Sequence, residues 1–180
     1  SDRAILALTE DRTNWLPEYM RLGVQICALT GLSGVDAHGL LMRSDRLALR
    51  TDDKGVMWLD GARKKSAVAL HAPVAPWLAE RLTAFFSRKI SVGELDTWAW
   101  HWSKIEDALH IPHLPLQGIK RLRVTFNVVV ENHIGVPVAV AKALMGHRIK
   151  GGDAHNAYTK PTDDLLVKAV LAFERVVFGG

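Results

Sequence analysis

The residues with the clearest capacity for chemistry lie in one segment, from position 119 to position 158. Lys120 and Arg123 are three residues apart at the start of an apolar helical pattern. His147 follows a glycine at the end of a second helical pattern, and Tyr158 lies eleven residues further on. Cationic side chains bind phosphate and a tyrosine phenol can act as a nucleophile, so this order of residues suits attack on a phosphodiester.

The spacing of these residues strengthens the prediction. Lys120 and Arg123 fall on one face of the first helical turn, where free N–H groups also favour an anion. Each residue taken alone has an ordinary structural explanation: a solvated basic helix start, a helix-end histidine at His147, a capping aromatic at Tyr158. The order and the context together carry the signal.

Positive charge is concentrated in the same segment. The 180-residue chain has a formal net charge of +4 and a pI near 9.4. Residues 117–152 contain six lysines and arginines against Glu131 alone, a net charge of +5, so the remainder is close to neutral. A localised basic cluster is the footprint expected of a phosphate-binding face.

Composition excludes several classes of protein. With 48% hydrophobic and 23% charged residues, the chain is expected to form one globular domain over residues 1–180. No apolar run approaches the roughly 20 residues of a membrane span. The lone Cys27 excludes a disulfide framework and indicates a reducing cytoplasm. His110 and His113 have no cysteine or carboxylate cluster beside them, so no metal site is expected.

Periodicity predicts a mainly helical α+β fold. Helices are expected at 14–30, 33–42, 74–88, 91–109, 119–132 and 137–144, with a final amphipathic helix from about 161. Ser33 and Asp36 form a capping-box pattern at the start of the second helix. Short strands at 47–50, 56–59 and 67–70, separated by turn residues, predict a small three-stranded antiparallel sheet.

The whole pattern resembles the catalytic domain of the tyrosine recombinases, the phage-integrase family. Residues 30–32 read Thr-Gly-Leu, as in the turn before the family's first arginine, and Asp36 stands where the family usually has an acidic residue. Residues 68–70, Val-Ala-Leu, are similar to the family's Val-Pro-Leu. The resemblance therefore makes Lys64 or Lys65 the family's hairpin lysine.

The strongest part of the resemblance lies between positions 119 and 158. Lys120 and Arg123 match the family's basic pair, with lysine in place of the commoner histidine, and His147 and Tyr158 match directly. The resemblance implies that Tyr158 forms a 3′-phosphotyrosyl bond while Arg123 and His147 hold the phosphate. It also implies that Lys120 assists proton movement, that the hairpin lysine protonates the leaving 5′-oxygen, and that no cofactor or metal is needed.

The same resemblance implies the partners. They are double-stranded DNA in the nucleoid and further copies of the chain, assembled as a tetramer on DNA. The family's amino-terminal DNA-binding domain is not recognisable in these residues, so the chain is expected to be the catalytic part of a longer protein. The residues expected to contact the DNA backbone are Arg121, Lys142, Arg148 and Lys150.

The resemblance fails at Ser33, where the family has its first arginine. Arg43 and Arg46, the next arginines, fall beyond the short helix. Losing one donor to a transition-state oxyanion typically costs ~10²–10³ in rate. The sequence therefore leaves open an impaired recombinase and a catalytically inactive DNA-binding module. A phosphotyrosyl topoisomerase is a more distant alternative.

Overall fold

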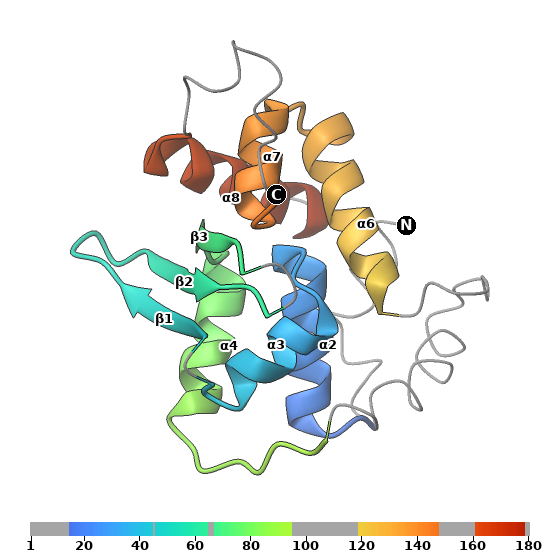
Figure 1. The fold of residues 1–180 in the computed structure, drawn as a ribbon, viewed down its shortest axis with the longest axis vertical. Coiled ribbons are helices and arrows are strands. Elements are labelled where there is room, and N and C mark those ends of the chain that lie inside the picture. Colours follow the sequence, from blue (N-terminus) through green and yellow to red (C-terminus); the bar gives the residue numbers. More distant parts are fainter. Residues whose placement is uncertain (1–14, 45, 65–66, 95–118, 148–160, 179–180) are drawn as a thin grey trace.

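The structure is a computed structural model that describes residues 15–44, 46–64, 67–94, 119–147 and 161–178. The fold consists of helices and one small sheet, as the sequence predicted; the sheet lies at one side of the molecule, and α6, α7 and α8 lie together at one end (Figure 1). The elements in chain order are α2 (Glu18–Thr30), α3 (Gly34–Leu41), β1 (Leu47–Thr51), β2 (Met57–Ala62), β3 (Ala69–Pro73), α4 (Pro76–Phe86), α6 (Lys120–Val128), the π-helix η2 (Val129–His133), α7 (Val138–Leu144) and α8 (Asp163–Phe178).

The sheet has the strand order β1-β2-β3 with both pairs antiparallel, which confirms the predicted three-stranded sheet. The turn between β1 and β2 closes because Asp52 Oδ1 accepts hydrogen bonds from the backbone N–H groups of Lys54 and Val56, each at 2.9 Å. Each strand begins or ends within three residues of its predicted bounds, as is usual for boundaries read from pattern alone.

Helix α2 is the centre of the core. Eight of its consecutive residues, 22–29, are buried, and Gly31 ends the helix in the left-handed conformation with φ of +67°. Ser33 then begins α3 as predicted: its hydroxyl accepts from the backbone N–H of Asp36. The path from α2 to α3 is thus fixed by a glycine and a capping serine.

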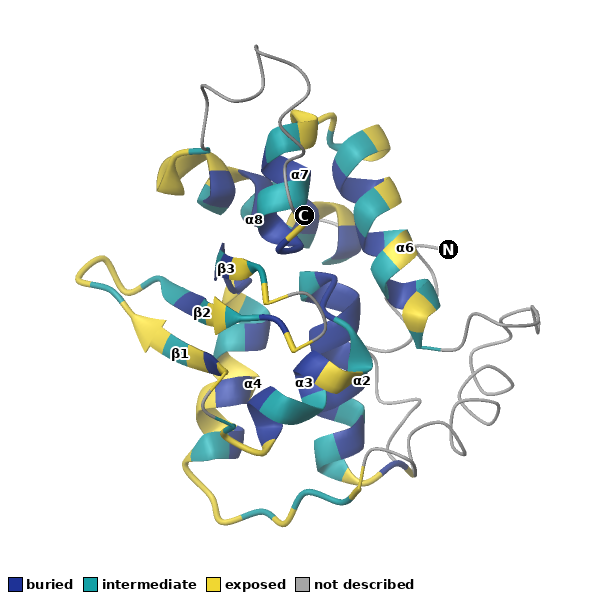
Figure 2. Ribbon diagram, in the orientation of Figure 1, coloured by how far each residue is buried: buried dark blue, intermediate teal, exposed yellow. Residues whose placement is uncertain are grey.

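Helix α6 packs on α2 and α8. Phe126 of α6 meets Phe173 of α8 with ring centroids 4.7 Å apart, and both side chains are fully buried. The buried faces of α6, α7 and α8 turn toward one another (Figure 2). The α6 helix continues without a break into η2, so the predicted helix 119–132 is confirmed with a π-helical last turn.

One predicted boundary is wrong. Residues 91–94 have no regular secondary structure, so the helix expected to start at Ser91 does not start there, and the rest of that helix lies outside the described residues. Val92 and its neighbours instead pack along the core edge, where a capping pattern alone does not make a helix. Within the described ranges, no helix is long and apolar enough to cross a membrane.

Candidate phosphate-binding site

Arg123 lies where three helices meet. Its Nη1 donates to the backbone oxygen of Gly31, which ends α2, and its Nη2 donates to the backbone oxygen of Met145, 3.2 Å away, which ends α7. Helix carboxyl ends carry partial negative charge, so a guanidinium is stabilised there. These contacts fix the plane of the Arg123 guanidinium before any ligand binds.

His147 lies against the same guanidinium. Arg123 Nη2 donates to Nε2 of His147, and because arginine can only donate, the imidazole must accept through Nε2. Partial loss of water around the ring, together with the charges of Arg123, Arg63 and Lys142, holds the pKa of His147 below its usual value. The ring is therefore neutral at pH 7, with its proton on Nδ1.

A second arginine, Arg63, reaches the same place from the end of β2. It is only 8% exposed. Its Nε donates to Asp36 Oδ2 at 3.1 Å, and its Nη1 donates to the Met145 backbone oxygen at 3.3 Å. Arg63 and Arg123 thus share one carbonyl acceptor. Two like charges this close repel, and an anion between them would relieve that repulsion.

The pKa of Arg123 is lowered by its surroundings in the site. Burial, followed by the nearby charge of Arg63, lowers this pKa to about 10. At neutral pH Arg123 is still protonated, but its charged form is less favourable than in water. A bound anion would reverse this effect, and the site is therefore suited to a phosphate group.

Asp36 is the buried carboxylate of the site, with 2% exposure. Burial opposes its ionisation, but hydrogen bonds from Ser33 Oγ, the Lys64 backbone N–H and Arg63 outweigh burial and lower the pKa of Asp36. Asp36 therefore balances one of the two guanidinium charges and positions Arg63. The other guanidinium, Arg123, has no carboxylate partner among the described residues.

Two glycines near the site are closely approached by neighbouring side chains. A Cβ at Gly146 would lie 2.8 Å from Cδ of Arg63, and a Cβ at Gly31 would lie 2.7 Å from a ring carbon of Phe126. Both glycines also have positive φ, which an L-residue adopts at a cost. The glycine before His147 is therefore needed for the packing of Arg63, whereas the glycine of the Thr-Gly-Leu motif is needed for the packing of Phe126.

The structure brings some predicted residues together and leaves others apart. Arg123 and His147 are in contact, as predicted from their order. Lys120 is exposed at the start of α6, one turn from Arg123, and Lys64 is exposed beside Arg63. Arg121 on α6 and Lys142 on α7 are partly buried. Outside the described residues lie Lys65, Arg148, Lys150 and Tyr158.

Arg63 is the residue that the sequence interpretation missed. Its neighbours Lys64 and Lys65 match the family pattern, whereas Arg63 does not. Both residues lie just after β2, where Arg63 is buried and Lys64 is exposed, so strand alternation gave no signal for Arg63. The carboxylate partner of Arg63 lies 27 positions away, which no local pattern reveals.

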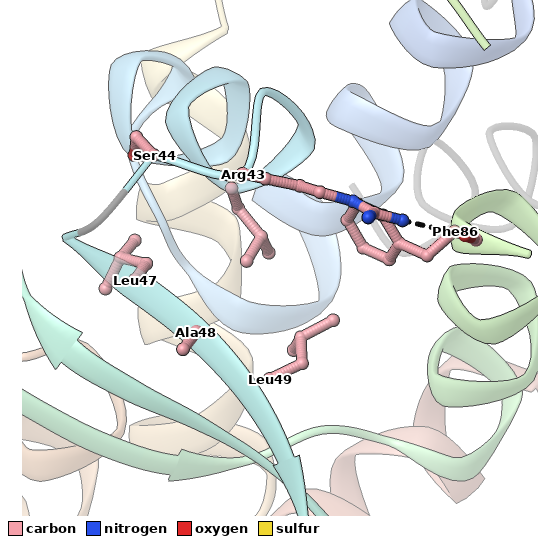
Figure 3. Close-up of a pocket in the computed structure, with 7 residues that line it drawn as sticks. Arg43, Ser44, Leu47, Ala48, Leu49 and Phe86 are labelled. Atoms are coloured by element: carbon pink, nitrogen blue, oxygen red, sulfur yellow. Dashed lines mark hydrogen bonds between the residues drawn. The ribbon is translucent and has the colours of Figure 1, made fainter. Parts of the chain in front are cut away.

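Arg43, the closest arginine after Ser33, lies at a different surface. Its Nη2 donates to the Phe86 backbone oxygen at 2.8 Å, and its guanidinium carbon lies 5.0 Å from the centre of the Phe86 ring. The side chain runs straight toward Phe86 along a pocket that Leu47 and Leu49 of β1 also line (Figure 3). Arg43 is thus engaged away from Arg123 and His147.

No protein family, curated protein or solved structure matches this chain at a significant level. The site presents two fixed guanidinium groups and one neutral imidazole, with further basic side chains close by in sequence. Such a set of donors, in which no described carboxylate is hydrogen-bonded to Arg123, can bind a phosphate oxygen and stabilise negative charge on it.

Proposed function

We propose that the protein is a DNA recombinase of the tyrosine type, which breaks and rejoins DNA through a 3′-phosphotyrosyl intermediate. The observation that carries the proposal is the contact of Arg123 with His147, brought together from positions 24 residues apart. Negative charge develops on the nonbridging phosphate oxygens during such a reaction. Donors already fixed at that place stabilise it without reorganisation.

Each residue has a role in this proposal. Tyr158 attacks the phosphorus, and Arg123 holds the nonbridging oxygens through its planar fork. The Nδ1–H of His147 is the imidazole donor available to the phosphate, because Nε2 accepts from Arg123. Lys120 assists proton movement, and the hairpin lysine protonates the leaving 5′-oxygen. The covalent bond to Tyr158 conserves the energy needed for rejoining.

The proposed partner is double-stranded DNA, on which copies of the chain assemble as a tetramer. Basic side chains that flank the site, Arg121 and Lys142 among them, would contact the DNA backbone and make binding depend on salt. A substitution that removes one bond to a DNA phosphate should reduce the slope of log K against log salt by about 1. The salt dependence of binding therefore distinguishes contacts with DNA phosphates from apolar association with the protein.

A second candidate function is that of a DNA-binding module without catalytic activity. The observation that favours it is the use of Ser33 as the N-cap of α3, where its hydroxyl bonds Asp36 at 2.6 Å. The hydrogen bonds of Ser33 are those of a helix cap and do not indicate a catalytic role. In this case Arg123 and His147 bind the DNA backbone and Tyr158 forms no adduct.

Covalent attachment of DNA distinguishes the two functions. A pool of end-labelled DNA duplexes of random sequence, each with one nick, is incubated with the protein. The mixture is then separated by electrophoresis in detergent, which preserves only covalent adducts. The recombinase proposal expects an adduct that Tyr158→Phe abolishes and Arg123→Gln reduces by ~10²–10³. Arg50→Gln is the control for removing a guanidinium away from the site, because Arg50 lies exposed on the sheet, where it pairs with Asp60.

Two results would contradict the proposal in different ways. Salt-dependent DNA binding by the native protein with no adduct would favour the non-catalytic module. An adduct that survives Tyr158→Phe would assign the nucleophile to another residue. Affinity for DNA that does not change between low and high salt would refute both functions.

A further inference from the structure

Arg63 is a buried arginine. The residue follows β2 directly, and its backbone is held in the hairpin turn: its N–H donates to Val68 O at 3.1 Å and its carbonyl accepts from Ala67 N at 2.9 Å. Its side chain is 8% exposed, whereas that of the next residue, Lys64, is exposed. Burying an arginine is costly unless it is paired, so its position calls for a reason.

Arg63 and Ser33 both donate a hydrogen bond to the same carboxylate oxygen of Asp36. Ser33 Oγ donates to Asp36 Oδ2 at 2.6 Å, and Arg63 Nε donates to the same oxygen at 3.1 Å. The guanidinium thus lies one hydrogen-bonded atom away from the side chain at position 33. Arg63 therefore places a positive charge next to residue 33, the position at which the resembled family has its first arginine.

The far end of Arg63 is directed toward Arg123. Nη1 of Arg63 and Nη2 of Arg123 donate to the same Met145 oxygen, at 3.3 and 3.2 Å. Among the described residues, Nη2 of Arg63 and Nε of Arg123 donate no hydrogen bond. The two groups therefore keep N–H donors for a ligand, and their planar forks suit the oxygens of a phosphate.

We propose that Arg63 is a second phosphate-binding guanidinium, which supplies from the hairpin turn after β2 the charge that Ser33 lacks. The ligand is the phosphodiester group of a DNA strand, bound between Arg63 and Arg123 with His147 at its side. This inference rests on the function proposed above and completes its phosphate site. Arg43 does not compete for the role, because it is engaged with Phe86 (Figure 3).

The alternative role for Arg63 is purely structural, as the partner of Asp36. Anion binding separates the two roles. The probes are sulfate and the dinucleotide thymidylyl-thymidine, which carries a single phosphodiester charge, titrated into ¹⁵N-labelled protein and followed by the shifts of arginine side-chain N–H resonances. Arg63→Lys keeps the charge but loses the fork, and Arg63→Gln loses both. Arg50→Gln is the control for removal of a paired surface arginine.

We expect Arg63→Lys to weaken binding of both probes about 10-fold and Arg63→Gln to weaken it more, with Arg50→Gln unchanged. Arg63→Gln leaves the buried carboxylate of Asp36 without its partner, which destabilises the fold. The double variant Asp36→Asn with Arg63→Gln removes both charges and avoids this destabilisation. The unfolding midpoint of each variant is measured in parallel. Asp36→Asn alone should bind the anions more tightly than the native protein, since Arg63 then has no competing carboxylate.

A rescue experiment tests the relation to position 33 directly. Ser33→Arg should raise anion affinity little in the native background. It should restore binding when combined with the folded Asp36→Asn, Arg63→Gln variant. Native-like affinity of the folded Arg63→Lys and double variants, with binding abolished in Arg123→Gln, would overturn this inference and leave the proposed function intact. Absence of anion binding by the native protein would instead overturn the phosphate site itself.

Discussion

The close approach of Arg63 to Gly146 allows a sharp test of the site. Gly146 has φ of +58°, and a Cβ there would lie 2.8 Å from Cδ of Arg63 and 3.2 Å from Cδ1 of Leu70. Gly135 has a similar φ of +71°, but a Cβ there would meet nothing within 4 Å. The substitutions Gly146→Ala and Gly135→Ala therefore share the backbone cost and differ in the contact with Arg63.

The magnitude follows from these two terms. Gly135→Ala should lower the free energy of unfolding by about 1 kcal/mol, the cost of a left-handed L-residue. Gly146→Ala should carry the same cost plus about 1–3 kcal/mol for forcing its neighbours out of a packed position. For a chain of this size each kcal/mol lowers Tm by about 2–4 °C. Thermal and urea unfolding followed by circular dichroism measure both variants.

A second readout links stability to the site. Displacement of Arg63 by the new methyl group should weaken sulfate binding in Gly146→Ala and leave it unchanged in Gly135→Ala. Arg63→Ala removes the side chain that the Cβ at position 146 would clash with. In the double variant Arg63→Ala with Gly146→Ala, the losses in free energy of unfolding should therefore be less than additive. Equal destabilisation by both glycine substitutions would refute the packing of Arg63 against Gly146.

Three further predictions concern titratable groups. The pKa of Asp36 is lowered in the folded state, so its contribution to stability is present above the unfolded pKa of about 3.9 and is lost as pH falls through the folded pKa. Between pH 6 and pH 2, the free energy of unfolding measured in urea should therefore fall less steeply with decreasing pH for Asp36→Asn than for the native protein. His147 should titrate below its usual pKa by NMR and shift upward when sulfate binds, and an unchanged titration with saturating sulfate would place the anion elsewhere. Burial raises the pKa of the Cys27 thiol, so it should react with dithiobisnitrobenzoate only on unfolding, and rapid reaction of the native protein would contradict its burial.

Local patterns predicted the secondary structure well, because each signal depends on neighbouring residues. The serine cap at Ser33, the glycine end of α2 at Gly31 and the turn at Asp52 all lie where sequence alone placed them. The start predicted at Ser91 failed because a capping pattern does not create a helix without the residues that follow. Boundaries elsewhere moved by a few residues, since the last turns depend on tertiary contacts.

The site was predicted only in part, for the opposite reason. The order of residues indicated that Arg123 and His147 would meet, and they do. Arg63 could not be found in this way, because its partners Asp36 and Met145 lie 27 and 82 positions away. A buried charge is decided by long-range pairing, which periodicity does not contain. The predicted nucleophile Tyr158 lies outside the described residues and stays a prediction.

The shared acceptor at the end of α7 has a consequence for how the protein reaches its native state. Met145 joins Arg63 and Arg123, and Arg123 bridges to Gly31 across 92 positions of the chain. Contacts of such long sequence separation form only after chain entropy has been lost, so they come late in folding. A fragment ending before α6 would contain Arg63 without Arg123 and could not form the site. Sulfate should therefore slow unfolding while leaving the refolding rate nearly unchanged, which makes the anion a reporter of the last step of assembly.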